Sequence, residues 1–194
     1  MSGKPQYDEP AVIDAAIEVF WRHGYAAASV SELTNATGLS RSSLYQRFGD
    51  KDGIFLEALS RYTDRVLQRM EGVRADTARA RVEAILRGFL PREGKSKYTP
   101  GCLLARSCVE MANLSAAGQQ AVNIGVRHQK AIIERILLAA AEHAELAKDA
   151  DLEGLAWFYV GMVQAVLNLP QAGAKRSELE RMIDIAMSAW PTEG

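Results

Sequence analysis

The chain has 194 residues, of which 48% are hydrophobic and 24% charged, a composition that lets a soluble globular protein build a core without disulfides or a structural metal. Two cysteines are too few for a secreted disulfide framework, and the net charge of −1 gives no sign of a nucleic-acid partner. Residues 1–6 lack the apolar run of a signal peptide. The most apolar stretch, residues 155–169, is shorter than the roughly 20 residues of a membrane span. We therefore expect a cytoplasmic protein with no membrane partner.

Apolar residues recur at a spacing of three or four along almost the whole chain, which is typical of amphipathic helices. Glycine, proline and serine interrupt this pattern at intervals, and no stretch reads as a strand. The sequence therefore predicts an all-α fold of nine helices, over residues 9–23, 30–37, 41–48, 51–71, 77–90, 102–113, 116–147, 152–169 and 178–190.

The first four predicted helices have clear start and stop signals. Gly24 follows the first helix as a left-handed terminator, and Ser29 with Glu32 forms a capping box for the second. Ser40 caps a short third helix, and Asp50 caps a long fourth one. In the same way, Ser177 and Glu180 predict a capping box for the ninth helix, which ends before Pro191.

Two short helices joined by the turn Gly38-Leu39-Ser40 have the geometry of a helix-turn-helix. On the second of them Leu44 and Phe48 lie four residues apart and are expected to face inward. Arginine can form a fork onto guanine, glutamine can pair with adenine, and hydroxyl groups can reach phosphates or base edges. The side chains left for a DNA major groove are Arg41, Ser42, Ser43, Tyr45 and Gln46, and Arg47 and Lys51 add basic charge nearby.

Two runs of this region resemble the TetR family of transcriptional regulators. They are Val19-Phe-Trp-Arg-His-Gly-Tyr-Ala-Ala-Ala-Ser-Val-Ser-Glu-Leu-Thr and Gly38-Leu-Ser-Arg-Ser-Ser-Leu-Tyr-Gln-Arg-Phe-Gly-Asp-Lys. The resemblance implies a homodimeric repressor that a small effector releases from a palindromic operator in double-stranded DNA. It also implies a helix-turn-helix domain at residues 1–50, continued through a connecting helix at 51–71, and an effector-binding and dimerisation domain at 72–194.

Carried over position by position, the resemblance assigns roles to individual side chains. Ser29 and Lys51 correspond to phosphate contacts, and Tyr45 corresponds to a tyrosine that lies along the DNA backbone. Lys4 stands in a short arm with a single charge, which could reach DNA or could remain a terminal residue without a contact. The expected DNA-binding residues are Ser29, Ser40, Arg41, Ser42, Ser43, Tyr45, Gln46, Lys51 and Lys4.

The eighth and ninth predicted helices are apolar on nearly all sides, which indicates burial on more than one face. Packing against the same helices of a second copy, as a four-helix bundle, would bury them, and the family resemblance implies this arrangement. The alternative is that they form only the core of one chain. The expected interface residues are Val160, Val163, Leu167, Ile183, Met187 and Trp190.

The resemblance places the effector among the fourth to eighth helices, where an apolar lining would suit a hydrophobic or aromatic ligand. Aromatic and methionine side chains at helical spacing are equally compatible with an ordinary core. The candidate effector-binding residues are Phe89, Tyr98, Cys102, Arg106, Met111, Trp157, Phe158 and Met162.

Cys102 suggests one alternative form of regulation. It begins a predicted helix, where the helix dipole favours a thiolate, and Arg106 follows four residues later on the same face. The segment Gly101-Cys-Leu-Leu resembles a segment of a TetR subgroup that includes thiol-based sensors. A repressor that responds to thiols or electrophiles through Cys102 is therefore one hypothesis, and a pair of small packing cysteines, Cys102 and Cys108, is the other.

An enzyme is not expected. The three histidines lack metal-ligand spacing, and the chain contains neither a phosphate-binding glycine loop nor a nucleophile elbow. We therefore expect no catalytic residue, metal or cofactor. A helical ligand carrier that does not bind DNA stays open as a further alternative.

Overall fold

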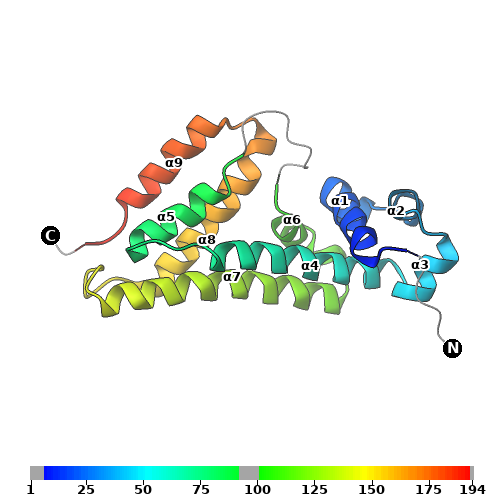
Figure 1. The fold of residues 1–194 in the computed structure, drawn as a ribbon, viewed down its shortest axis with the longest axis horizontal. Coiled ribbons are helices and arrows are strands. Elements are labelled where there is room, and N and C mark those ends of the chain that lie inside the picture. The colour runs from blue at the N-terminus through cyan, green and yellow to red at the C-terminus, as the bar shows by residue number, and fades with distance from the viewer. Residues whose placement is uncertain (1–6, 92–100, 193–194) are drawn as a thin grey trace. The chain divides into compact units, whose positions relative to one another are not determined.

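The computed structural model describes residues 7–91 and 101–192. Two predicted site residues, Lys4 and Tyr98, lie outside these ranges. Within them the chain is all-α and has no strand, which confirms the predicted fold class. The helices, labelled in Figure 1, are α1 (Glu9–Ala27), α2 (Val30–Thr37), α3 (Arg41–Phe48), α4 (Lys51–Glu71), α5 (Ala78–Gly88), α6 (Leu103–Val109), α7 (Ala116–Glu142), α8 (Leu152–Asn168) and α9 (Arg176–Ser188), with short 3-10 helices η1 (Met111–Asn113) and η2 (Leu169–Ala172).

The helices form two compact units that interleave along the chain. The first unit comprises Met1–Arg65 and Leu103–Gly125, and the second comprises Val66–Cys102 and Val126–Gly194. In the first unit α6 packs against α1, and in the second α5 packs against α8 and α9 (Figure 1). The division by packing thus differs from the division at residue 71 that the sequence suggested, because residues 103–125 return to the N-terminal helices.

The N-terminal caps follow the predicted pattern. Ser29 Oγ accepts the backbone N–H of Glu32 at 3.1 Å, and the Glu32 carboxylate accepts the backbone N–H of Ser29 at 2.8 Å. Ser40 Oγ accepts the backbone N–H of Ser43 at 3.1 Å and so starts α3. At Gly24 the backbone has φ +81° and ψ +171°, a combination that glycine adopts readily but that lies outside the left-handed helical region of the predicted terminator. Helical structure resumes after this kink and continues to Ala27.

Several predicted helix boundaries differ from those of the structure. Helix α6 stops at Val109 and gives way to the 3-10 turn η1, and α7 stops at Glu142 rather than at residue 147. Helix α9 begins at Arg176, so the third helical residue is Glu178, whose carboxylate accepts the backbone N–H of Lys175 at 2.7 Å. Glu180 instead accepts a hydrogen bond from Arg176 at 2.8 Å, and the predicted capping box of Ser177 and Glu180 does not form.

Buried aromatic and aliphatic side chains fill both units. In the first unit Phe20 and Phe55 meet edge to face, with ring centroids 5.2 Å apart, beside the fully buried Leu33. In the second unit Tyr159 is fully buried, and burial raises its pKa to about 12 because the charged phenolate would lose its solvation.

Helix α8 is unusually apolar. Together with η2 it covers Leu152–Ala172, 21 residues that include an 18-residue window with a mean hydropathy of 1.3. By length and composition this segment could cross a membrane, but a core helix of a soluble protein passes the same test. The 15-residue stretch seen in the sequence was therefore too short a measure of this element. In the structure one face of α8 is buried in the second unit, whereas Trp157, Phe158 and Leu169 are exposed.

Candidate DNA-binding surface

Helix α3 presents a polar face to solvent because its two large apolar side chains point inward. Leu44 is 0% exposed and Phe48 8% exposed. The helix has only eight residues, so fixing these two positions fixes the orientation of all the others. Arg41, Ser42, Tyr45 and Gln46 are exposed as predicted, and Ser43 is half-buried.

Arg41 and Tyr45 are already arranged as a pair. The Arg41 guanidinium lies 5.6 Å from the centre of the Tyr45 ring, and its Nη2 donates a hydrogen bond to the Tyr45 hydroxyl at 3.4 Å. Ser42 and Ser43 each place Oγ 2.9 Å from Ser40 Oγ, so three hydroxyl groups gather at the start of α3. This end of α3 therefore offers a cation, a phenol and clustered hydroxyl groups, which are groups that bind phosphates and base edges.

Lys51 has a second role that the sequence did not reveal. Its ammonium group donates hydrogen bonds to the backbone carbonyls of Tyr25, at 3.0 Å, and Ala28, at 3.2 Å, and lies 4.5 Å from the centre of the Tyr25 ring. Two of the three ammonium hydrogens thus hold the segment between α1 and α2. The third can still bind a phosphate, so the predicted DNA contact is chemically compatible with this position.

The positive charge of Arg47 is neutralised by carboxylates within the first unit. From the sequence we had expected this residue to add basic charge near the DNA. Its guanidinium hydrogen-bonds to Glu9 of α1 and to Glu57 of α4, at 2.9 Å for the Glu57 contact, and lies 4.8 Å from the Phe48 ring. The side chain therefore fixes the C-terminal end of α3 between its two neighbours. Only the folded arrangement brings Glu9 and Glu57 to it.

Most of the predicted dimer-interface residues are placed inside the second unit. Val160, Val163, Ile183, Met187 and Trp190 are all buried within a single chain, and Leu167 is half-buried. The first five are covered by their own chain and contribute to its core, and their contact with a second copy stays a prediction. The apolar side chains that α8, η2 and α9 expose are Trp157, Phe158, Leu169 and Ile185, and Ile185 is 71% exposed.

The candidate effector residues are divided between the two units. Arg106 and Met111 belong to the first unit, where Arg106 pairs with Glu110 at 3.5 Å. The remaining described candidates belong to the second unit: Phe89 and Cys102 are buried, Met162 is half-buried, and Trp157 and Phe158 are exposed. Cys102 is only 1% exposed, and its backbone N–H donates to Asn168 Oδ1 at 3.1 Å.

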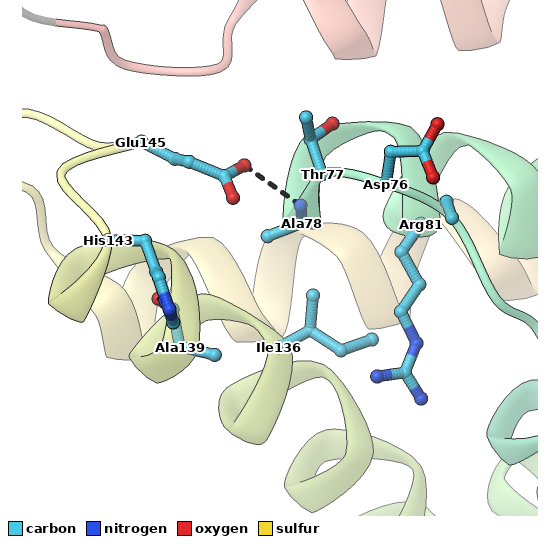
Figure 2. A pocket seen from close by; sticks show the side chains of 9 residues that line it. Asp76, Thr77, Ala78, Arg81, Ile136, Ala139, His143 and Glu145 are labelled. Carbon is cyan, nitrogen blue, oxygen red and sulfur yellow. Dashed lines mark hydrogen bonds between the residues drawn. The ribbon is translucent and has the colours of Figure 1, made fainter.

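A cavity of about 220 Å³ lies in the second unit, between the N-terminal end of α5 and the C-terminal end of α7. Figure 2 shows Arg81, Ile136 and His143 around it, with Glu145 accepting the backbone N–H of Ala78. That hydrogen bond, 2.8 Å long, gives a partner to one of the backbone N–H groups in the first turn of α5 that have none within the helix. None of the side chains predicted to bind an effector lines this cavity.

Two family patterns match the chain. The pattern described as "Bacterial regulatory proteins, tetR family" matches residues 12–58, and the pattern described as "Tetracyclin repressor-like, C-terminal domain" matches residues 78–186. The first covers α2, α3 and the residues around Lys51, and the second alone covers more than half of the chain.

Individual relatives agree over nearly the full length. The HTH-type transcriptional repressor ComR of Escherichia coli (strain K12) is 29% identical over 97% of this chain and 92% of its own. A cysteine mutant of the TetR family transcriptional regulator CifR, solved with 26-bp double-strand operator DNA, is 27% identical, with a TM-score of 0.83 over 97% of this chain and 100% of that one. The chain therefore belongs to the TetR family and is a DNA-binding transcriptional regulator.

Proposed function

We propose that the chain is a homodimeric repressor that reads the two halves of a palindromic operator with α3 and leaves the DNA when a small effector binds. The observation that carries this proposal is the exposed polar face of α3, held outward by the buried Leu44 and Phe48. A solved relative of similar length binds operator DNA, which supports the same use of this face.

One α3 helix contacts only a few bases. We assign the contacts of each side chain from its place on the helix. Arg41, Ser42 and Gln46 face the bases, and Tyr45 lies along the DNA backbone. Ser29, Ser40, Ser43 and Lys51 bind phosphates near the ends of α2, α3 and α4. Specific binding then requires two copies of α3 about one helical turn of DNA, ~34–36 Å, apart.

We assign dimerisation to the exposed apolar stripe of α8, η2 and α9. Trp157 and the exposed Gly161 lie four residues apart on α8, Phe158 adjoins Trp157, and the exposed Leu169 follows in η2. We propose that these side chains and the exposed Ile185 of α9 together form an apolar patch of the kind that marks a protein interface. A second copy would cover this patch with its own identical stripe.

The effector is proposed to be a small apolar or aromatic molecule bound by the domain that follows α4. The buried Phe89 and the half-buried Met162 remain candidates for its lining, because both lie in the second unit. The thiol-sensor alternative has less support, because Cys102 is buried and Arg106 already pairs with Glu110.

Selection of bound sequences from random double-stranded DNA tests this function. The expected result is a palindromic consensus that the dimer retards in a gel shift, with affinity falling steeply as salt rises. The selected DNA then serves as the probe for release by apolar and aromatic compounds. Folded dimer that enriches no sequence would contradict the proposal.

A further inference from the structure

The kink in α1 leaves a backbone donor that the helix cannot satisfy by itself. Gly24 has φ +81° and ψ +171°, so the helical ladder is interrupted at that residue. The N–H groups just after such a break have no carbonyl aligned four residues earlier. The Ala28 N–H donates a hydrogen bond to Gly24 O at 3.2 Å. The Ala26 N–H instead donates to a side chain that lies outside α1.

That side chain is Glu110, which directly follows α6. Its Oε2 accepts the Ala26 N–H at 3.1 Å, and its Oε1 lies 3.5 Å from Arg106 Nε. Only 18% of the Glu110 side chain is exposed, so water competes weakly for the carboxylate. A Cβ at position 24 would collide with this carboxylate and come within 2.9 Å of Arg106 Nε, so the contact requires glycine there.

The same short segment is also held from its other side. Lys51, the first residue of α4, donates to the carbonyls of Tyr25 and Ala28, while Glu110 accepts the N–H of Ala26. Ser29 follows at once and caps α2. Two opposite charges, one from α4 and one from the end of α6, therefore fix the segment from which α2 starts.

We propose that Glu110 is a positioning residue for operator binding. Its carboxylate holds the Ala26 N–H and thereby sets the N-terminus of α2, including Ser29, against the DNA phosphates. This inference rests on the proposed operator binding and adds a residue that does not itself touch DNA.

The test compares Glu110→Ala, Glu110→Gln and Glu110→Asp on the operator selected with the wild-type protein. Glu110→Ala removes the acceptor, and we expect about tenfold weaker binding, the effect of one lost charge-assisted hydrogen bond. Hydrogen exchange should accelerate at residues 25–28 in the same variant. Glu110→Gln keeps an oxygen acceptor and should restore both affinity and protection toward the wild type.

Glu142→Ala, at the exposed C-terminal end of α7, is the matched control and should leave the affinity unchanged. If Glu110→Ala does not fold, Glu110→Asp replaces it, because a carboxylate one methylene shorter should not reach Ala26. Wild-type affinity in a folded Ala or Asp variant would overturn the inference while leaving the proposed function intact. Failure of the wild type itself to bind any DNA would count against the proposed function instead.

Discussion

Tyr45 and Gln46 stand side by side on the exposed face of α3, but their surroundings differ. Tyr45 is held by the guanidinium of Arg41, so its ring is already oriented before DNA arrives. Gln46 is exposed, and its amide can present a donor and an acceptor to an adenine edge. At the scale of single residues, then, Tyr45 is oriented by its neighbour Arg41, and Gln46 is one of the residues proposed to read a base.

Replacing Gln46 by alanine should relax the operator consensus at one position in each half-site. The loss of a bidentate contact to a base costs about 1–3 kcal/mol of discrimination, and the exposed position should leave the melting temperature nearly unchanged. Selection from random DNA with the variant measures this directly. An unchanged consensus would show that Gln46 does not face a base.

Arg47→Ala should behave differently, because Glu9 and Glu57 already neutralise this guanidinium. We expect a loss of stability below about 1 kcal/mol, since the ion pairs are partly exposed. The slope of operator affinity against salt should stay the same, because no phosphate contact is lost. A slope reduced by about one unit would mean that Arg47 leaves its partners and binds the DNA.

At the scale of elements, α8 and α9 each have one buried face and one exposed face. One face of each helix is buried in the second unit, and the other leaves Trp157, Phe158 and Ile185 exposed. Ile183 and Ile185 are only two residues apart on α9, yet Ile183 is fully buried and Ile185 is 71% exposed. Substitutions at these two residues can therefore test folding and the proposed dimerisation separately.

Ile185→Asp should yield a folded monomer with much weaker operator binding, because a charge would be buried in the proposed interface. Light scattering after gel filtration gives the mass, and circular dichroism confirms the helices. The matched change, Ile183→Ala, should instead cost about 2–5 kcal/mol of stability by leaving a cavity, with the dimer retained. A dimeric Ile185→Asp protein would refute the assigned stripe.

Short-range signals in the sequence were sufficient for the helix-turn-helix. Ser29, Ser40 and Gly38 act within three or four residues of themselves, so their roles follow from local pattern. The apolar character of α9 predicted burial on several faces. It did not distinguish whether Ile183 or Ile185 packs against its own chain. The contacts of Lys51 and Glu110 join residues 23 and 84 positions apart in the chain, and no local pattern encodes them.

At the scale of the whole molecule, ion pairs between α1 and α4 link stability to pH. Asp14 accepts hydrogen bonds from Arg61, at 2.7 Å, and from Arg65, at 2.6 Å. Burial alone would raise the pKa of Asp14, but these two guanidinium groups outweigh it and lower the pKa below the usual 3.8. The folded state therefore favours the ionised carboxylate.

Asp14→Asn should accordingly destabilise the protein at neutral pH and lose this effect in acid. The contribution of the carboxylate is complete above its unfolded pKa and disappears as the pH falls through the lowered folded value. Because 42% of the side chain is exposed, we expect less than about 1 kcal/mol. Urea unfolding at several pH values measures the difference, with the exposed Asp64→Asn as control; a difference that persists in acid would contradict the assignment.

The interleaving of the two compact units bears on how this protein can be divided. A fragment that stops after α4 would contain the helix-turn-helix but would lack Leu103–Gly125, which complete the first unit. Such a fragment would expose the surface of α1 that α6 covers and would leave Ala26 without its acceptor. A fragment designed to carry the helix-turn-helix alone therefore needs residues 103–125 as well, joined to it by an artificial linker.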